Sequence, residues 1–493
     1  MELVNKKILH IESFPDTPLI DTSTEIALNL KDKNNVNFFW CGYDLPWKDW
    51  ELSIFKKTLG FSFEKKVSII ENILRSKKVN IIDKIHLSEK KQNYIYKWAN
   101  NYNKKKNLKK FLYKENNVYV NLGISVESSL LSIYKNYNFK KNDFIIKKSL
   151  ISSAIVFNRS LEAIKRIKPS SVITFNNRFA ISRPIIEAAK LCKVNVIRHE
   201  VGSSKKKYEL FYDDVHNVNS RCKVIYNYWN NTSKKTRLKN AVNFFKMPYK
   251  NKNKINTGSG KIKSFSKNQS KTIQLPKNKK IVTFFTSSNY EYEAISADFS
   301  FLARSIDFKD QITALKSLVS IVNKFKNYLL VIRVHPSFKN SDFENSFWEK
   351  YESNNIKLIK SESKINSFDL MKKSDYVVTY GSTLAIHAAY NNIPSITLRK
   401  HVFSCSKILI EPKNKRDLYK ILRKKNFKNT KIKCLPYGNY IMSFGKKFKY
   451  FKRDIIFKGY INGIMVNNFG TFVNFVLSLF YPLIRFYKKN EFD

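Results

Sequence analysis

Residues that interrupt or cross-link a chain are scarce in this sequence. The 493 residues include 12 Gly, 12 Pro and 5 Cys. So little glycine and proline excludes a collagen-like or linker-rich protein. Five cysteines without a close pair or a C-x-x-C motif exclude a disulfide scaffold and leave no visible structural zinc site. Hydrophobic residues make up 43% of the chain, which excludes disorder and is enough to fill two or three domains.

Long apolar runs are also missing. No stretch of about 18 apolar residues occurs, so we expect no spanning helix. The first residues are too polar for a secretory signal. The nearest candidate, residues 472–486, contains Pro482 and is followed by Lys488 and Lys489. We expect either an interfacial segment or a terminal helix packed on the protein's own core. The expected location is cytoplasmic, peripheral on the inner face of the cytoplasmic membrane.

Acidic residues are few, with 39 Asp+Glu against 91 Lys+Arg and a net charge of +52. Such a charge is typical of proteins that meet an anionic membrane surface, nucleic acid or an acidic substrate. A codon bias towards Lys and Asn explains the same composition without any partner. Because no RNA-binding signature with interleaved aromatics is present, we expect an anionic membrane surface as a partner and no specific nucleic acid.

Strand and helix patterns alternate twice along the chain. The first series has strands at 7–12, 36–42, 171–176 and 194–199, with helices through 26–28 and 185–191. The second has strands at 280–286, 328–336, 356–359, 375–380 and 394–398, with helices through 312–324 and 384–390. This alternation predicts an α/β protein with two Rossmann-like, doubly wound domains. We expect domains at 1–245 and 279–430, a basic linker or loop at 246–278, and a helical C-terminal extension at 431–493, for which a membrane-interfacial position is one of the alternatives.

The predicted linker has its own composition. Residues 246–280 contain 11 Lys and no Asp or Glu, with Ser, Asn and Gly between them. This pattern indicates a flexible linker or exposed loop. A basic tract that contacts lipid headgroups or RNA is the alternative.

Three polar sets follow strands of the second series. Taken singly, each has a plain structural explanation: a polar loop, a surface ion pair or a helix N-cap. However, parallel strands end at the same edge of a sheet, where ligands of such folds bind. Together the sets predict a nucleotide or phosphate site. Its residues are Ser287, Ser288 and Glu291; Arg333 and His335; and Gly381, Ser382 and Thr383.

Several motifs of other enzyme classes are absent. The chain has no P-loop ending in GK[ST], which argues against NTP hydrolysis, and no GxGxxG, which argues against a dinucleotide cofactor. HExxH and GxSxG are missing as well. The seven His are scattered in the sequence, so we expect no metal site and no cofactor.

The order of the motifs resembles that of GT-B glycosyltransferases, in particular those of capsule and surface-polysaccharide synthesis. In the second half, Arg333-Val334-His335-Pro336 is similar to an RxHP element, and 375–383 to a strand followed by G-S-T. Residues 284–291 are similar to an "ftSS-x-x-E" opening. In the first half, 175–180 is similar to "fNGR" and 199–202 to "HERG", and 435–438 is similar to "lPYG". The resemblance spans roughly residues 5 to 450.

The resemblance implies transfer of a sugar from a nucleotide-activated donor to a growing surface glycan or lipid-linked acceptor, without a metal or cofactor. It implies an N-terminal acceptor domain and a C-terminal donor domain. His387 stands where a Glu is expected, Asn177 replaces a Gly and Val201 replaces an Arg. The donor residues are then the three polar sets above with His387. On the acceptor side they are Asn177, Arg178 and Gly202, and the candidate catalytic bases are Asp16, His199 and Glu200.

Two other functions remain open from the sequence. One is transfer of a polyol phosphate, of the CDP-glycerol type, by an enzyme of the same fold. The other is a catalytically inactive scaffold of an envelope-polysaccharide complex. The replacement of the expected Glu by His387 is the feature that supports this alternative. A nucleic-acid-binding role rests on charge alone.

Overall fold

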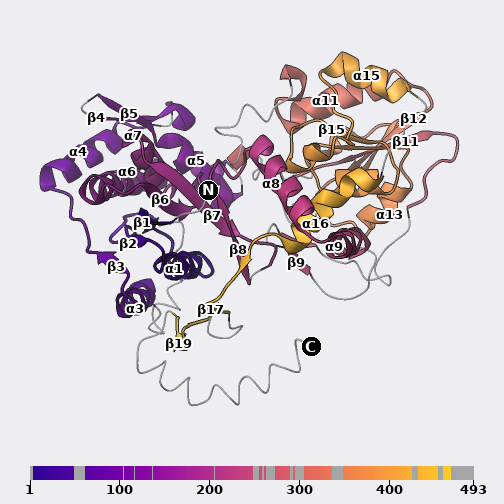
Figure 1. The fold of residues 1–493 in the computed structure, drawn as a ribbon. Helices are drawn as coiled ribbons and strands as arrows, with labels where there is room; N and C mark the ends of the chain where they lie inside the picture. The colour runs from indigo at the N-terminus through magenta and orange to yellow at the C-terminus, as the bar shows by residue number, and fades with distance from the viewer. Residues whose placement is uncertain are drawn as a thin grey trace, which may run out of the picture. The chain divides into compact units, whose positions relative to one another are not determined.

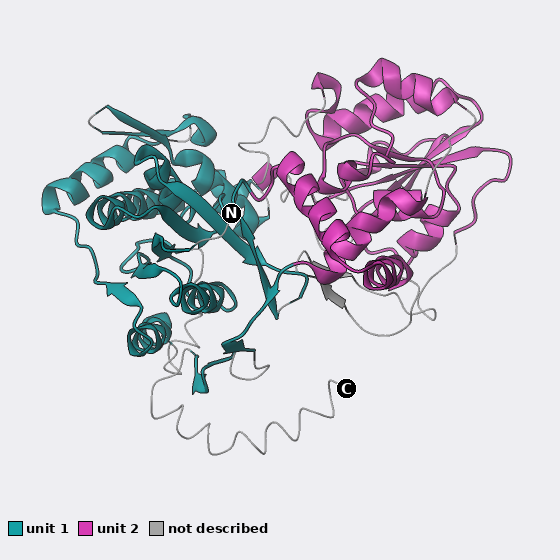
Figure 2. Ribbon diagram, in the orientation of Figure 1, with its two compact units in different colours: residues 1–214, 445–493 teal, residues 215–444 magenta. Residues whose placement is uncertain are grey.

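The computed structural model divides the chain into two units (Figure 2), residues 1–214 with 445–493 and residues 215–444. It describes residues 4–48, 62–103, 105–115, 117–135, 137–204, 206–247, 255–257, 260–262, 273–288, 293–294, 305–335, 348–424, 431–453 and 459–467. Both units have parallel strands and flanking helices (Figure 1), so the predicted α/β class is confirmed.

Unit 1 is built on a seven-stranded sheet of order β16-β8-β7-β6-β1-β2-β3. Strands β7, β6, β1, β2 and β3 are parallel. At one edge β8 pairs antiparallel with β7, and β16 pairs antiparallel with β8. Five of the six residues of β1 are buried, as expected for a strand covered on both faces. The strands are β1 (Lys7–Glu12), β2 (Asn35–Trp40), β3 (Asn80–Ile82), β6 (Ser171–Phe175), β7 (Asn195–Val201), β8 (Lys207–Phe211) and β16 (Lys446–Lys447).

The helices of unit 1 connect these strands. Helix α1 links β1 to β2 and α7 links β6 to β7, the βαβ connections that parallel neighbours require. A hairpin and several further helices lie between β3 and β6 in the chain. These elements are α1 (Leu19–Leu30), α3 (Phe63–Ser76), α4 (Glu89–Asn100), η1 (Leu108–Lys110), β4 (Leu112–Glu115), β5 (Val118–Asn121), α5 (Gly123–Tyr134), η2 (Asn138–Lys141), α6 (Asp143–Ile167) and α7 (Arg183–Leu191).

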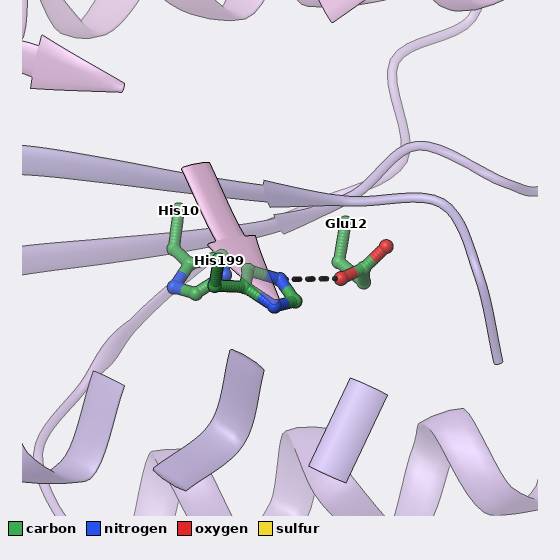
Figure 3. A group of neighbouring side chains, drawn as sticks. All are labelled: His10, Glu12 and His199. Carbon is green, nitrogen blue, oxygen red and sulfur yellow. Dashed lines mark hydrogen bonds and ion pairs between the residues drawn. The ribbon is translucent and has the colours of Figure 1, made fainter. Parts of the chain in front are cut away.

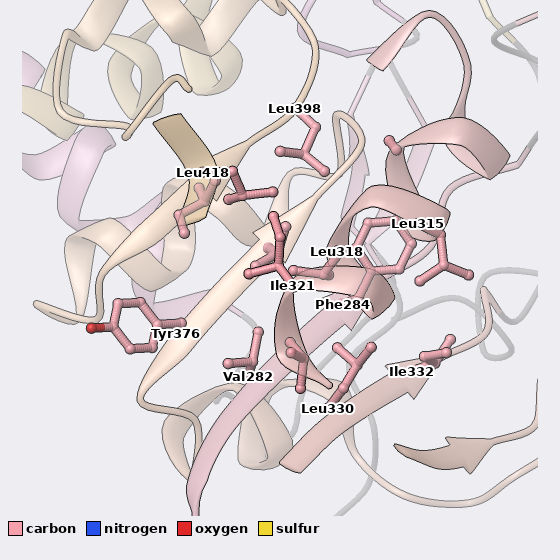
Figure 4. Close-up of a cluster of buried hydrophobic side chains, with 14 of the residues drawn as sticks. Val282, Phe284, Leu315, Leu318, Ile321, Leu330, Ile332, Tyr376, Leu398 and Leu418 are labelled. Atoms are coloured by element: carbon pink, nitrogen blue, oxygen red, sulfur yellow. The ribbon is translucent and has the colours of Figure 1, made fainter. Parts of the chain in front are cut away.

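Unit 2 contains a five-stranded, fully parallel sheet of order β13-β12-β11-β14-β15. Its core lies where side chains of β11, β12 and β14 meet α11 and α15, as Figure 4 shows for Phe284, Leu318 and Leu418. The strands are β11 (Lys280–Phe285), β12 (Tyr328–Arg333), β13 (Ile356–Ile359), β14 (Tyr376–Thr379) and β15 (Ser395–Thr397). The helices are η6 (Ile306–Phe308), α11 (Gln311–Val322), α13 (Ser367–Lys372), α14 (Leu384–Tyr390), η8 (Val402–Ser406), α15 (Lys415–Arg423) and η9 (Lys431–Cys434).

The boundary between the units lies at residue 214 rather than at the predicted 245. Helices α8 (Val218–Asn231) and α9 (Lys234–Lys246) pack with α14 and α16 (Leu435–Ser443) in one apolar cluster of unit 2. Phe245 of α9 stacks on Tyr390 of α14 with ring centroids 4.0 Å apart. A disulfide joins Cys222 to Cys405 across 183 residues. The sequence showed no close cysteine pair, because this pair forms only when α8 lies against η8.

The predicted linker and extension also contain more structure than expected. Within the described part of 246–278, β9 (Ile255–Thr257) and β10 (Gly260–Ile262) form an antiparallel pair. In the described part of the extension, the helical elements are η9 and α16 (Leu435–Ser443). After it, β16 joins the sheet of unit 1, and β17 (Phe451–Lys452), β18 (Tyr460–Ile461) and β19 (Ile464–Met465) form a small sheet. The candidate interfacial segment, 472–486, lies outside the described residues.

Within the part of the chain that the structure describes, no helix has both the length and the apolar character needed to cross a bilayer.

Candidate functional site

The structure brings two of the three predicted polar sets of unit 2 together. The amide of Thr286, after β11, donates to the carbonyl of Arg333 over 3.1 Å. The amide of His335, after β12, donates to Thr286 Oγ1 over 2.8 Å. Ser288 Oγ lies 3.5 Å from His335 Nδ1. The carboxyl ends of β11 and β12 therefore form one polar surface, as their parallel pairing requires.

Ser287 contributes an unpaired hydroxyl to this surface. Its side chain is 4% exposed, and its Oγ has no partner among the described residues. Its backbone is held by Gln311, which accepts from the Ser287 amide over 2.6 Å and donates to the Ser287 carbonyl over 3.1 Å. A buried hydroxyl without a partner is costly unless a ligand or water completes it.

Arg333 lies at the same strand end but its guanidinium binds backbone. The side chain is 2% exposed and donates to the carbonyls of Lys360 and, over 3.2 Å, Ser363. Burial lowers the pKa of Arg333 to about 10, so it remains charged at neutral pH. Arg333 thus holds the loop that follows β13, and its positive charge lies close enough to His335 to act on it.

His335 is a neutral group in this setting. Burial and the nearby charge of Arg333 lower its pKa from 6.5 to about 4. At pH 7 the imidazole therefore binds as a hydrogen-bond donor or acceptor. The sequence pattern had suggested an Arg–His pair directed at an anion. The structure instead indicates one fixed charge, on Arg333, and neutral donors around it.

The third predicted set, Gly381-Ser382-Thr383, follows β14, the strand on the other side of β11. Gly381 has φ of +108°, which permits the turn at the strand end. Ser382 Oγ accepts from the Leu384 amide over 3.3 Å, and Thr383 is exposed. Helix α14 has only seven residues, so its dipole adds little to anion binding. Glu291, predicted to complete this site, lies outside the described residues.

His387 is placed in the apolar core of unit 2. It is 2% exposed, with its ring 5.0 Å from Phe244, 5.2 Å from Phe245 and 5.2 Å from Phe368. Burial lowers its pKa to about 3. The structure therefore does not support the predicted contact between His387 and a donor sugar, because the surrounding rings enclose the imidazole.

In unit 1, the ends of β1 and β7 bring Glu12 and His199 together (Figure 3). His199 Nε2 lies 3.2 Å from Glu12 Oε2. Ser23 of α1 donates to the same carboxylate oxygen over 2.5 Å and lies 2.9 Å from His199 Nε2. The other oxygen, Oε1, accepts the amides of Ser13 and Phe14 over 2.7 and 2.9 Å. Glu12 and His199 are 0% and 1% exposed, so this pair is enclosed.

His10 lies beside this pair. It precedes Glu12 by two residues on β1 and so projects from the same face of the sheet. Its ring centroid is 5.7 Å from that of His199 and 5.6 Å from Phe38. Burial, and next the nearby His199, hold the pKa of His10 well below its usual value. No local pattern predicts this group, because His10 and His199 lie on strands far apart in the chain.

Glu200, the neighbour of His199 on β7, has different partners. Consecutive residues of a strand face opposite sides of the sheet, so Glu200 is directed away from Glu12. The side-chain amide of Asn176 donates to Glu200 Oε1. Asn176, at a positive φ of 50°, also accepts the amides of Asn177 and Arg178 over 2.5 and 3.1 Å. Glu200 is half-buried.

The other predicted residues of unit 1 have defined positions. Asp16 is half-buried in the turn after β1, where its carbonyl accepts the Leu19 amide over 2.7 Å. Asn177 is buried. Arg178 donates to Ser132 over 2.8 Å and lies 4.2 Å above the Phe179 ring. Gly202 allows the β7–β8 turn, since a Cβ there would come within 2.7 Å of Lys207 Cβ.

Three side chains in these sites were not predicted: Glu12 as a partner of His199, Ser23 and Gln311. Glu12 ends a strand, and Ser23 lies within helix α1. Gln311 begins a helix far from Ser287 in the chain. One sequence signal could have identified Glu12 as a site residue, namely that it is a polar residue at the carboxyl end of a strand.

No protein-family model matches the chain, and no curated protein matches it in sequence. Among solved structures, it is similar to KpsC, a beta Kdo 2,4 transferase from Thermosulfurimonas dismutans, at 10% identity and a TM-score of 0.35 over 55% of this chain and 79% of that one. It is also similar to a UDP-GlcNAc 2-epimerase from Methanocaldococcus jannaschii in complex with UDP-GlcNAc and UDP, at 11% identity and a TM-score of 0.29 over 87% and 97%. Likenesses this weak assign no reaction to this chain.

Proposed function

We propose that this protein is a glycosyltransferase that transfers a sugar from a nucleotide-activated donor to a growing surface glycan or lipid-linked acceptor. The observation that carries the proposal is the polar surface at the carboxyl ends of β11 and β12, beside which the buried hydroxyl of Ser287 has no partner among the described residues. The motif resemblance supplies the class of reaction.

The donor is proposed to bind unit 2 through its phosphates. Ser287 and Ser288 offer hydroxyls, and neutral His335 offers a ring nitrogen. The buried charge of Arg333 lies beside them and favours an anionic leaving group. In this scheme neutral donors fix the position of the phosphate and one cation balances its charge.

The acceptor is proposed to lose its proton to a carboxylate of unit 1. A general base must come within hydrogen-bond reach of the hydroxyl that it activates. His199 is enclosed and already contacts Glu12 and Ser23. Asp16 and Glu200 are half-buried, so we favour these two as the candidates to test by Asn and Gln replacement.

The first experiment is a thermal-shift screen of the full chain against UDP, GDP, CDP, CMP and dTDP, with Ser287→Ala as the test variant. Ser395→Ala is a matched control. Ser395 Oγ is also buried and has no partner in the described part of the chain, but it lies at the amino end of β15 in the same sheet. Stabilisation by one nucleotide that is lost only in Ser287→Ala supports the donor site. No stabilisation by any nucleotide at millimolar concentration contradicts it.

Once the base is known, product analysis tests the reaction. Incubation with sugar and polyol derivatives of that nucleotide, followed by mass spectrometry, should show addition of a glycosyl group. Addition of a polyol phosphate would replace the glycosyltransferase proposal with the alternative. Nucleotide binding without turnover of any donor would favour the inactive scaffold.

A further inference from the structure

His10 is a fully buried imidazole whose ring nitrogens, Nδ1 and Nε2, both lack a partner among the described residues. A neutral imidazole always carries one N–H donor and one lone pair. Buried polar atoms without partners are rare, and each calls for an explanation such as an ion or ordered water. The surroundings of His10 favour an ion.

Two further ligand groups lie beside it. One ligand atom each from His10, Glu12 and His199 lies within 4.8 Å of the others. Figure 3 shows the three side chains gathered at the sheet. Zinc binds imidazole nitrogen and carboxylate oxygen at about 2.0–2.2 Å, so tetrahedral ligand atoms lie about 3.4 Å apart. The 3.2 Å between Glu12 Oε2 and His199 Nε2 already has this spacing.

Glu12 is held in place by hydrogen bonds, as carboxylate ligands of protein metal centres commonly are. Glu12 Oε1 is fixed by two backbone amides, so Oε2 is directed towards His199. Ser23 adds a fourth polar atom, within 2.9 Å of both partners. Phe38 and Phe175 place aromatic rings 5.6 Å from His10 and 5.5 Å from His199. Hydrogen-bonded ligands inside an apolar shell are typical of protein metal centres.

We propose that His10, Glu12 and His199 bind one divalent transition-metal ion of the zinc class. Two imidazoles and a carboxylate form a donor set that zinc takes in proteins. All three ligands are at most 1% exposed, so the site is closed to substrate. It is therefore a structural site, which ties β1 to β7 across β6. The prediction of no metal rested on the scattered histidines and did not consider this pairing.

The test uses the full chain without a histidine tag. Protein grown with zinc and then dialysed should retain about one zinc per chain by mass spectrometry of the metal. After removal of zinc with a chelator, the thermal midpoint should fall and should recover on adding zinc alone. Cobalt(II) added to the stripped protein should give the visible absorption bands of a tetrahedral site.

His10→Phe is the test variant, because it keeps an aromatic ring against Phe38. His387→Phe is the matched control: His387 is also buried, and its Nδ1 has no partner that the structure describes, but it lies among phenyl rings. We expect His10→Phe to lose zinc, the zinc-dependent midpoint and the cobalt bands, and His387→Phe to keep all three. Glu12→Gln should also lose them.

If a variant does not fold, measurements on the wild-type protein still test the proposal. The proposal fails if the stripped wild type takes up no zinc, shows no zinc-dependent rise of its midpoint and gives no cobalt bands; the space beside His10 then holds at most water. It also fails if folded His10→Phe binds zinc as tightly as the wild type. None of these readouts depends on transfer activity.

Discussion

Three histidines of unit 2 are kept neutral by burial, and this couples stability to pH. His335 has a pKa of about 4, and His387 and His401 have pKa values of about 3, in each case chiefly because burial penalises the charged form. In the unfolded chain these groups titrate near 6.5. Below that pH the unfolded state takes up protons that the folded state does not, so stability falls as the pH falls.

We therefore predict that the free energy of unfolding decreases from pH 6.5 towards pH 4. One such histidine lowers the free energy of unfolding by up to about 1.4 kcal/mol for each pH unit below 6.5. His387→Phe should reduce the loss between pH 6.5 and pH 5 by about 2 kcal/mol, measured by urea denaturation at each pH. An equal slope in wild type and His387→Phe would contradict the prediction.

At the scale of elements, Glu25 of α1 holds the segment that returns to unit 1. Its carboxylate accepts the amides of Lys449, Tyr450 and Phe451 over 2.6, 2.8 and 2.8 Å. Asn29 donates to it over 2.6 Å. Glu25 is fully buried, so these donors replace the water that a carboxylate needs.

We predict that Glu25→Gln destabilises unit 1 by about 1–3 kcal/mol, because a Gln side chain presents one N–H-bearing end to amides that need an acceptor. Hydrogen exchange at 449–451 should rise more than elsewhere in unit 1. Glu162→Gln, at an exposed position of α6, serves as the control. Unchanged exchange at 449–451 would show that the three hydrogen bonds do not hold the segment.

Helices α1 and α3 share an enclosed ion pair. Lys66 Nζ lies 3.2 Å from Asp21 Oδ2, and both side chains are 0% exposed. Lys66 Nζ also donates to Thr17 over 2.7 Å. A buried pair contributes little net stability, but removal of one partner leaves an unpaired buried charge.

We predict that Lys66→Met costs about 3–5 kcal/mol and that Lys66→Met with Asp21→Leu recovers most of it. A double-mutant cycle by chemical denaturation measures the coupling. If the destabilisation of the double variant equals the sum of the destabilisations of the two single variants, the enclosed ion pair is contradicted. Lys31→Met with Asp32→Leu, a surface pair, should show coupling below about 1 kcal/mol.

For the whole molecule, the net charge of +52 predicts binding to anionic lipid vesicles that salt abolishes. Electrostatic attraction is screened over about 10 Å at 0.1 M salt and about 3 Å at 1 M. Vesicles with phosphatidylserine should therefore co-sediment with the protein at low salt and release it at about 1 M salt. Binding to neutral vesicles, or binding that resists salt, would indicate insertion of an apolar segment instead.

Much of the fold could be predicted because its signals are local. The strands β1, β6, β11 and β12 are short apolar runs, and helices between them predict parallel pairing. The unit boundary could not be predicted, since α8 and α9 carry an ordinary amphipathic pattern. An amphipathic pattern does not show which unit a helix packs against. In the structure, the apolar faces of α8 and α9 pack against α14 and α16.

The candidate site was also predictable where its signals are local and unpredictable where they depend on packing. Ser287, Arg333 and His335 were recognised as a group because each follows a strand, and parallel strands end at one edge. The roles of two residues changed because a side chain's partners depend on packing: Arg333 is turned to the carbonyls of Lys360 and Ser363, and His387 is enclosed by phenyl rings.

The sequence alone determined the α/β class, the excess of positive charge and the edge of the unit 2 sheet where polar groups gather. Each of these depends on composition or on residues close together in the chain. Only the tertiary structure paired Glu12 with His199, Cys222 with Cys405 and Glu25 with the segment at 449–451. These contacts join residues more than 170 positions apart, and the order of strands in a sheet decides which distant side chains meet.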